Sequence, residues 1–161
     1  MSGRPIKALV VSISDTRREE DDVSGVTLVG LLIAMGVEVH EKVIVSDDLE
    51  DIRNTLYVAS EREDVDLIIT TGGTGFADRD NTPEATHAVI EREAPGIAEA
   101  IRRETAKNTP LAMLSRSVCG IRNRTLIINL PGSPKPVKES FEVIEPVQQH
   151  EINLIIAETG H

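Results

Sequence analysis

Aromatic residues are almost absent from the sequence, and cysteine occurs once. The chain has no tryptophan, one tyrosine and two phenylalanines, which leaves no aromatic platform on which nucleic-acid bases could stack. The single cysteine, Cys119, can form no internal disulfide and cannot build a zinc cluster. We therefore expect Cys119 to be a small buried hydrophobe in a cytoplasmic protein.

Long hydrophobic runs and a secretory leader are also absent. No stretch of about 18 apolar residues occurs, so the sequence predicts no transmembrane helix. Met1–Pro5 leads directly into a predicted strand and does not resemble a signal peptide. The four histidines lack metal-ligand spacing, and no G-x-S-x-G motif indicates a hydrolase of that type.

The charge is negative overall but unevenly distributed. A net charge of −10 argues against non-specific nucleic-acid binding. Residues 102–138 nevertheless contain many lysines and arginines and only one acidic residue, Glu104. Such a segment suits a small, highly charged anion, or else most of its members are ordinary surface or subunit-contact charges. The basic residues are Arg102, Arg103, Lys107, Arg116, Arg122, Arg124, Lys135 and Lys138.

Hydrophobic patterning predicts one α/β domain over residues 1–161. Apolar strands alternate with helical patterns, which implies right-handed crossovers and a three-layer α/β/α arrangement around a mostly parallel central sheet. A β-hairpin is expected near residues 111–130, with its turn at 120–123. The other predicted elements are strands at 6–14, 37–45 and 65–70, and helices at about 24–36, 49–59, 83–93, 95–107, 137–145 and 147–157, the last two separated by Pro146.

A glycine-rich stretch carries the strongest functional signal. The apolar strand ending at Thr71 runs into Gly72-Gly73-Thr74-Gly75, whose backbone can approach an anion closely. Neither G-x-G-x-x-G nor a Walker lysine is present, so the run could also be an ordinary turn. Asp78, Arg79 and Asp80 favour a site, because open α/β sheets bind ligands at the carboxyl ends of their strands. Thr82 is expected to cap the next helix, with Pro83 in its first turn.

Two aspartates are candidate metal ligands. Asp80 follows the glycine run and could hold Mg²⁺ bridging the phosphates of a nucleotide, or form an Asx-type turn. Asp47 ends the second predicted strand and could reach the same edge. Alternatively, Asp47 and Glu50 form a capping box at the next helix.

Two further loops offer anion-binding groups. One runs from Ser12 to Thr16 and continues at 22–25, where Ser24 is a candidate N-cap; the acidic run 19–22 reads as a solvated surface. The other, 131–135, places amides, a hydroxyl and a lysine at a predicted helix N-terminus, where phosphate binds readily. Alternatively, the two prolines of this loop only mark the boundary of the helix. Phe76 could pack on a flat heterocycle or on the protein itself.

These motifs resemble a known family. Thr70-Thr71-Gly-Gly-Thr-Gly75, Arg79-Asp80 with Thr82-Pro83-Glu84-Ala85, and Glu93-Ala94-Pro95-Gly96 follow the order found in the MogA/MoaB family of molybdenum cofactor biosynthesis. The match extends to Ser14-Asp15, Ser24-Gly25, Ser115-Arg116 and 129–135, so it covers essentially the whole chain. The related domains of plant proteins and of gephyrin share these motifs.

The resemblance implies Mg²⁺-dependent transfer of AMP from ATP to molybdopterin, which releases pyrophosphate. It gives Asp47 and Asp80 catalytic and metal-organising roles. The residues that it implies for nucleotide binding are those of the loop: Thr71, Gly72, Gly73, Thr74 and Gly75. Phosphate- or pterin-binding roles then fall on Ser14, Asp15, Ser24, Ser115, Arg116, Pro131, Gly132, Ser133 and Lys135.

Two other functions stand beside this one. Some MoaB-type members are thought to bind pterin or nucleotide without turnover, although Asp47 and Asp80 favour an active enzyme here. CinA-type nucleotide pyrophosphatases share a similar glycine loop. The family further implies a homotrimer, with a hexamer as the alternative, and a molybdenum insertase that receives the product; tungsten in place of molybdenum is left open.

Overall fold

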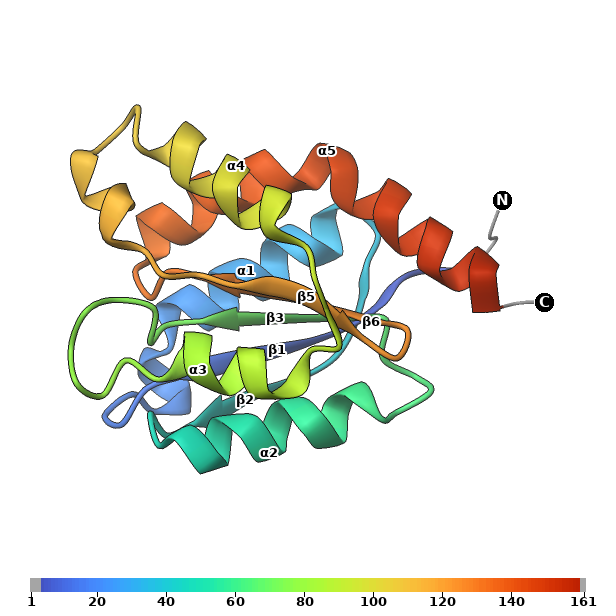
Figure 1. The fold of residues 1–161 in the computed structure, drawn as a ribbon, viewed down its shortest axis with the longest axis horizontal. Coiled ribbons are helices and arrows are strands. Elements are labelled where there is room, and N and C mark those ends of the chain that lie inside the picture. The colour runs from blue at the N-terminus through green and yellow to red at the C-terminus, as the bar shows by residue number, and fades with distance from the viewer. Residues whose placement is uncertain (1–3, 160–161) are drawn as a thin grey trace.

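A six-stranded sheet separates two layers of helices in the computed structural model, which describes residues 4–159 (Figure 1). The strand order is β2-β1-β3-β6-β5-β4, and β2, β1, β3 and β6 are parallel. The hairpin β5–β6 and the short β4 complete the sheet in antiparallel pairings. The strands are β1 (Lys7–Ile13), β2 (Glu38–Val45), β3 (Leu67–Thr71), β4 (Arg92–Glu93), β5 (Cys119–Arg122) and β6 (Thr125–Leu130).

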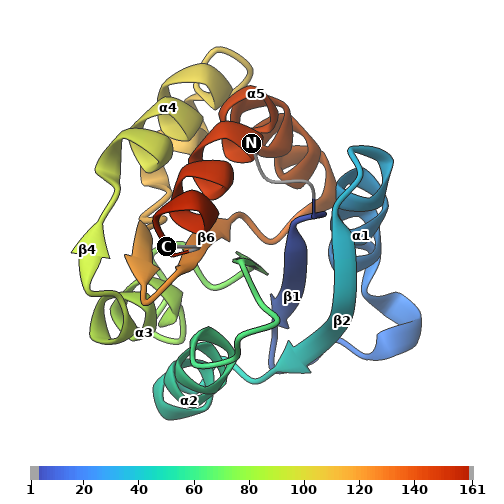
Figure 2. The same cartoon turned by 90° about the vertical axis from the view of Figure 1, so that its right-hand side faces the viewer.

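The helices cover both faces of this sheet, as Figures 1 and 2 show. On one face lie α1 (Val23–Ala34), α4 (Pro95–Thr105) and α5 (Pro134–Thr159); on the other lie α2 (Leu49–Ser60) and α3 (Thr82–Val89). Two short 3₁₀ helices, η1 (Glu19–Asp21) and η2 (Pro110–Leu114), lie in connections. The expected three-layer, mostly parallel α/β fold is confirmed.

Alternation along the strands divides the core between the two layers. Val10 packs with α1, α4 and α5, whereas its neighbours Leu9 and Val11 pack with α2 and α3. β3 alternates in the same way through Ile68 and Ile69, because successive side chains of a strand point to opposite faces. Cys119 is fully buried, as expected, and burial raises the pKa of its thiol to about 12.

The expected strand at 111–118 is wrong. Thr109 accepts a hydrogen bond from the Leu111 amide, and Pro110 begins η2, so local turn chemistry prevails over the apolar pattern. Leu111 and Met113 remain exposed instead of joining the sheet. The hairpin is therefore shorter, 119–130, and it turns at Asn123 (φ 52°) and Arg124 rather than at 120–123.

Two helix predictions also need correction. The helix expected to reach Glu93 ends at Val89, because Ile90 is extended and β4 pairs with β5 through Arg92 and Ile121. The helix expected to break at Pro146 continues through it, so α5 spans 134–159 without a separate final helix. Proline removes one amide donor, a loss that this 26-residue helix tolerates.

The topology creates a single switch point. β1 leads to β2 through α1 on one face, and β2 leads to β3 through α2 on the other. The loops after β1 and β3 consequently diverge at the carboxyl edge of the sheet, where such folds bind ligands. These loops gather at the left of Figure 1. Among the described residues, no helix has the length and apolar character needed to cross a membrane.

A substitution at Phe141 tests how tightly α5 packs on the core. Its side chain is 2% exposed, whereas Phe76 is 68% exposed in the loop after the glycines. We expect Phe141→Ala to lower the free energy of unfolding by about 3–5 kcal/mol, because it leaves a cavity. Urea unfolding measures this, with Phe76→Ala as the control that stays within about 0.5 kcal/mol. Equal losses in both variants would contradict the packing described for α5.

Candidate functional site

The loops after β1 and β2 are joined at the carboxyl edge by two aspartates. The Asp15 amide donates to Asp47 Oδ2 at 2.9 Å, and the Asp47 amide donates to Asp15 Oδ1 at 3.0 Å. The loops after β3 and β6 are linked in turn, since Thr71 Oγ1 donates to the Pro131 carbonyl at 2.6 Å. Residues that the sequence nominated from four separate segments thus share one edge.

The glycine loop requires glycine at two positions. Gly72 and Gly73 have φ values of 106° and 69°, in the left-handed region. A Cβ atom on Gly72 would lie 2.5 Å from the Ile13 carbonyl oxygen, and one on Gly73 would lie 2.3 Å from Thr82 Oγ1. Thr82 Oγ1 donates to the Gly72 carbonyl, so it braces this loop instead of capping α3, whose N-cap is Asn81.

The amides of this loop are available to a ligand. The N–H groups of Gly73, Thr74 and Gly75 donate to no group among the described residues. The carbonyls of Thr74 and Gly75 accept hydrogen bonds from Arg116, through its amide (2.9 Å) and its Nε (2.8 Å). An anion facing the loop would therefore meet free amide donors.

Asp80 closes the loop and leaves one oxygen unused. Its Oδ2 accepts from the Ala77 amide at 2.9 Å, three residues earlier, so it closes the loop backward and does not form the Asx-type turn, which needs an amide two residues later. Its Oδ1 accepts no hydrogen bond from a described residue. Arg116 Nη2 holds the Asp80 carbonyl at 2.7 Å and also pairs with Glu84. Arg116 is thus committed to loop structure and to Glu84, although the sequence nominated it for a phosphate.

Asp47 is held in a negatively charged setting. Burial is the largest cause that raises the pKa of its carboxyl, and the charges of Asp15 and Asp80 raise it further. The alternative role of Asp47 in a capping box is excluded, because Asp48 caps α2 by accepting from the Asp51 amide. Asp47 Oδ1 accepts no hydrogen bond from a described residue, so this oxygen is free to meet a cation.

Arg79 offsets part of this charge. Its Nε and Nη2 donate to the two carboxylate oxygens of Asp15, at 3.0 and 2.8 Å. The hydrogen bonds from Arg79 are the largest cause that lowers the pKa of Asp15. Asp15 is therefore engaged by an arginine and by the Asp47 amide, whereas Asp47 and Asp80 each keep a free oxygen.

Sequence reasoning missed Asp22, which it assigned to a solvated acidic surface. Asp22 is 1% exposed and accepts from Ser12 Oγ (2.6 Å), Lys42 Nζ (2.7 Å) and the Gly25 amide (3.1 Å). Burial alone raises its pKa, but the hydrogen bonds from Lys42 and Ser12 hold that pKa below its usual value. The signal was present: Asp22 lies three residues before Gly25, the spacing of an N-cap.

The Asp22 cluster supports the loop after β6. Asp22, and not Ser24, is the N-cap of α1. Ser24 Oγ donates to the Gly132 carbonyl at 2.7 Å, and Arg17 Nη2 donates to the same carbonyl at 3.3 Å while its Nη1 pairs with Asp22. Ser24 therefore positions the loop 131–133 instead of presenting a free hydroxyl.

The remaining nominated residues lie around these loops. Ser14 Oγ accepts from the amides of Thr16 and Arg17, which orders the loop after β1. Ser115 Oγ lies 2.9 Å from Ser117 Oγ. Ser133 and Lys135 are exposed at the start of α5, and Lys135 forms no ion pair with a described residue.

Most of the basic segment serves the structure. Arg122 pairs with Glu61 and stacks on Tyr57, and Lys107 pairs with Glu104. Arg102 donates to two backbone carbonyls. The expectation that many of these charges have structural roles agrees with these contacts.

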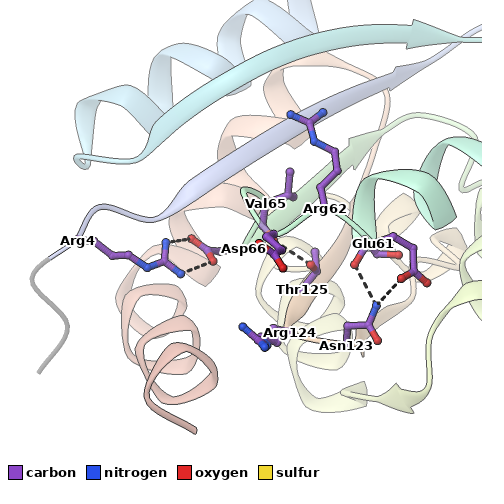
Figure 3. Close-up of a pocket in the computed structure, with 10 residues that line it drawn as sticks. Arg4, Glu61, Arg62, Val65, Asp66, Asn123, Arg124 and Thr125 are labelled. Carbon is purple, nitrogen blue, oxygen red and sulfur yellow. Dashed lines mark hydrogen bonds and ion pairs between the residues drawn. The ribbon is translucent and has the colours of Figure 1, made fainter. Parts of the chain in front are cut away.

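A polar cavity lies at the end of the sheet opposite to the glycine loop, and Figure 3 shows its lining residues. It measures about 250 Å³, and its groups already pair with one another. Arg4 makes two 2.8 Å hydrogen bonds with Asp66, and Asn123 Nδ2 donates to the Ser60 carbonyl and to Glu61. The Asn123 contacts join the end of α2 to the hairpin, and the Arg4 contacts join the segments that precede β1 and β3.

The site offers two carboxylates for a divalent cation, but not a complete cage. Among the residues whose side chains the structure describes, no group of three or more His, Cys, Asp or Glu could hold a metal ion. Mg²⁺ is commonly held by one or two carboxylates together with substrate phosphates. Asp47 Oδ1 and Asp80 Oδ1 fit that mode of binding, in which the nucleotide supplies the other oxygens.

The chain is similar to proteins of molybdenum cofactor biosynthesis. Residues 9–150 match the family model described as a probable molybdopterin binding domain. The molybdopterin adenylyltransferase of Helicobacter pylori is 40% identical over 152 residues, which cover 91% of this chain and 86% of that protein.

A longer relative and a solved structure agree with this match. The molybdenum cofactor synthesis protein cinnamon of Drosophila melanogaster is 44% identical over 91% of this chain, which spans only 25% of that protein. The crystal structure of the molybdopterin biosynthesis enzyme MoaB from Thermus thermophilus has a TM-score of 0.86 and 41% identity, covering 93% of this chain and 96% of that one.

Asp22→Asn is expected to destabilise the protein by about 3 kcal/mol, because it removes the buried partner of Lys42. Since the pKa of Asp22 is lowered on folding, its contribution is present above the unfolded-state pKa and is lost as the pH falls through the folded-state pKa. Thermal unfolding at pH 7 and in acid measures both effects. The control Glu20→Gln, on a 72% exposed side chain, leaves stability unchanged; a similar loss there would refute a special role for Asp22.

Asp47→Asn is expected to raise Tm slightly at pH 7 without divalent cations, by about 1–2 °C. The pKa of Asp47 is raised on folding, so its ionised form opposes folding at high pH and the gain disappears as the pH falls below the folded-state pKa. The neighbouring Asp48→Ala should do the opposite, because it removes the cap of α2. A lower Tm for Asp47→Asn would show that its charge stabilises the fold.

Proposed function

The chain belongs to the molybdopterin-binding, MoaB/MogA-type family of molybdenum cofactor biosynthesis proteins, and on that premise we propose that it transfers AMP from ATP to molybdopterin. A terminal phosphate oxygen of molybdopterin attacks the α-phosphorus of ATP, and the bond from that phosphorus to the bridging oxygen breaks. Adenylyl-molybdopterin forms and pyrophosphate leaves. The name of the Helicobacter relative supports this reaction.

One observation carries the proposal: free amides face the same edge as two unused carboxylate oxygens. The amides of Gly73, Thr74 and Gly75 can hold phosphate oxygens, and Asp47 Oδ1 and Asp80 Oδ1 can hold a cation beside them. Phosphoryl-type transfer needs charge neutralisation and alignment more than a side-chain nucleophile. The site supplies these two requirements.

The side chains divide the work of binding and alignment. Asp47 and Asp80 would hold Mg²⁺, which supplies charge neutralisation on the phosphates when bound. Arg116 fixes the carbonyl side of the glycine loop, so the amides of the loop are already oriented when a nucleotide arrives. Ser133 and Lys135, exposed at the start of α5, are positioned at a helix N-terminus that favours a phosphate.

We further propose a partner, a compartment and an oligomeric state for this protein. The product passes to a molybdenum insertase, and the chain works in the cytoplasm as a homo-oligomer, a trimer or a hexamer, as the resemblance to the family implies. Sedimentation measures the oligomeric state directly, independently of turnover.

Asp80→Asn tests the reaction against a matched control in the same loop. We expect pyrophosphate release from ATP, Mg²⁺ and freshly liberated molybdopterin to fall by about 10²-fold or more, while ATP binding persists. Asp78→Asn, at an exposed neighbouring position whose side chain makes no hydrogen bond with a described residue, should retain turnover. Near-normal turnover in Asp80→Asn would remove Asp80 from the mechanism.

The wild-type protein decides between this function and its alternatives. Pyrophosphate release that depends on the pterin establishes the adenylyltransferase. Binding of ATP or pterin without release indicates a non-catalytic MoaB-type protein. Cleavage of ADP-ribose indicates a CinA-type pyrophosphatase instead.

A further inference from the structure

Asn129 is a fully buried polar side chain near the carboxyl end of β6. A buried carboxamide is costly unless its polar atoms find partners. Here both donors and the acceptor oxygen are used. Oδ1 accepts from the Val118 amide at 3.1 Å, and Nδ2 donates to Thr70 Oγ1 and to Thr86 Oγ1, each at 3.0 Å. The partners of this one side chain come from three separate parts of the fold.

The partners determine both the residue type and the orientation of the carboxamide. A backbone amide can only donate, so the oxygen of Asn129 faces Val118 and its nitrogen faces the two threonines. A carboxylate has no donor to offer the threonines, and a hydroxyl has only one. Asparagine therefore suits a position that joins one backbone donor to two hydroxyl acceptors.

The first connection sets the path of the segment 115–118. Asn129 donates its backbone amide to the Val118 carbonyl at 3.1 Å, and β5 begins one residue later. In a regular antiparallel ladder the Val118 amide would bond to a backbone carbonyl, but here it bonds to the side chain of Asn129. The segment that leaves the sheet at this point carries Arg116. The carbonyls that Arg116 holds are those of Thr74, Gly75 and Asp80.

The other two connections reach the strand before the glycine loop and the helix after it. Thr70 lies in β3 two residues before Gly72, and it is level with Asn129 in the parallel pair β3–β6. Thr86 is one turn along α3 from Thr82, whose hydroxyl donates to the Gly72 carbonyl at 2.9 Å. The segments on both sides of the loop therefore meet at one side chain.

Among the described residues, the backbone of 72–75 bonds only to parts of the fold that Asn129 joins. One amide of the loop donates to the carbonyl of Leu130, which follows Asn129 directly in β6. Two of its carbonyls accept from Thr82 in α3, and two accept from Arg116. The loop has no other hydrogen bond to a described residue, so its position depends on how these parts are held together.

We propose that Asn129 is a positioning residue for the nucleotide. It ties β3 and α3 to the segment 115–118, and it thereby keeps the free amides at 73–75 in one orientation. Because Asn129 is fully buried, it acts through the glycine loop and not by contact with a substrate. Its role rests on the proposed function and adds to it the buried side chain on which alignment of the loop depends.

Two substitutions test this role at different strengths. Asn129→Leu keeps the branching of the side chain but removes its polar atoms, whereas Thr86→Val removes only the link to α3. The probe is the α,β-methylene analogue of ATP with Mg²⁺, which binds without being cleaved at the α-phosphorus. We expect its Kd, measured by calorimetry, to rise about 3-fold for Thr86→Val and about 10-fold or more for Asn129→Leu, because displaced donors hold phosphate less well.

Amide NMR signals distinguish positioning from stability. In the wild type, the analogue should shift the ¹H–¹⁵N signals of residues 73–75. In both variants these signals should be displaced or broadened before the analogue is added, because the loop is no longer held in one orientation. A side chain that contributes to stability alone would lower Tm on substitution and leave these signals unchanged.

Thr125→Val is the matched control on the same strand. Thr125 is buried at the other end of β6, where its Oγ1 donates to the Val65 carbonyl at 2.9 Å. The control also loses a buried hydrogen bond, so its Tm should fall about as far as that of Thr86→Val. We expect its Kd for the analogue to stay within about 2-fold of the wild type, and its signals at 73–75 to stay in place, because the two sites are independent.

The outcomes separate this role from the proposed function. An unchanged Kd and unchanged loop signals in Thr86→Val overturn the role of Asn129, even where Asn129→Leu does not fold. Equal losses in Thr125→Val overturn it as well, because they trace the effect to stability. An analogue that does not bind the wild type leaves no nucleotide to position and also overturns it. Binding and loop signals that depend on Thr86 and Asn129, found without pyrophosphate release, support the role and refute the adenylyltransferase.

Discussion

Gly72 lies where the loops after β1, β3 and β6 meet, and the space that a side chain would need is occupied by backbone. Its amide donates to the Leu130 carbonyl, a Cβ atom would meet the Ile13 carbonyl oxygen at 2.5 Å, and its own carbonyl accepts from Thr82. A Cβ on Gly132 would likewise lie 3.2 Å from Gly72 Cα. Three loops thus pack backbone to backbone here, and the amides at 73–75 donate to no group among the described residues.

Charged side chains around these loops determine which aspartates are paired. Asp22 is buried with four donors around it, and it holds α1, β2 and the support of Gly132 in one cluster. Asp47 is the opposite case, since burial and two neighbouring carboxylates raise its pKa. The fold thus surrounds Asp22, which fixes the loops, with hydrogen-bond donors. It leaves one carboxylate oxygen each of Asp47 and Asp80, which would meet a cation, without a donor. Such local cost is expected where function competes with stability.

The sequence predicted most of the fold and many of the site residues, and its errors have local causes. Alternating apolar strands and spaced helices define the parallel core, and the glycine run after β3 indicates an anion site. The capping roles predicted for Ser24 and Thr82 were wrong, and the capping alternative for Asp47 failed, because several neighbouring residues could cap and only the backbone path selects one. The strand expected at 111–118 failed because an apolar run does not reveal whether a neighbouring strand is available.

The sequence by itself determined the family, the α/β class and the glycine loop, because these follow from periodicity and from residue types whose backbone freedom is unusual. Only the tertiary structure decided which charges meet. It buried Asp22, committed Arg116 to the glycine loop, and paired Arg79 with Asp15. Residues distant along the chain become neighbours only through packing, and local pattern carries no record of that proximity.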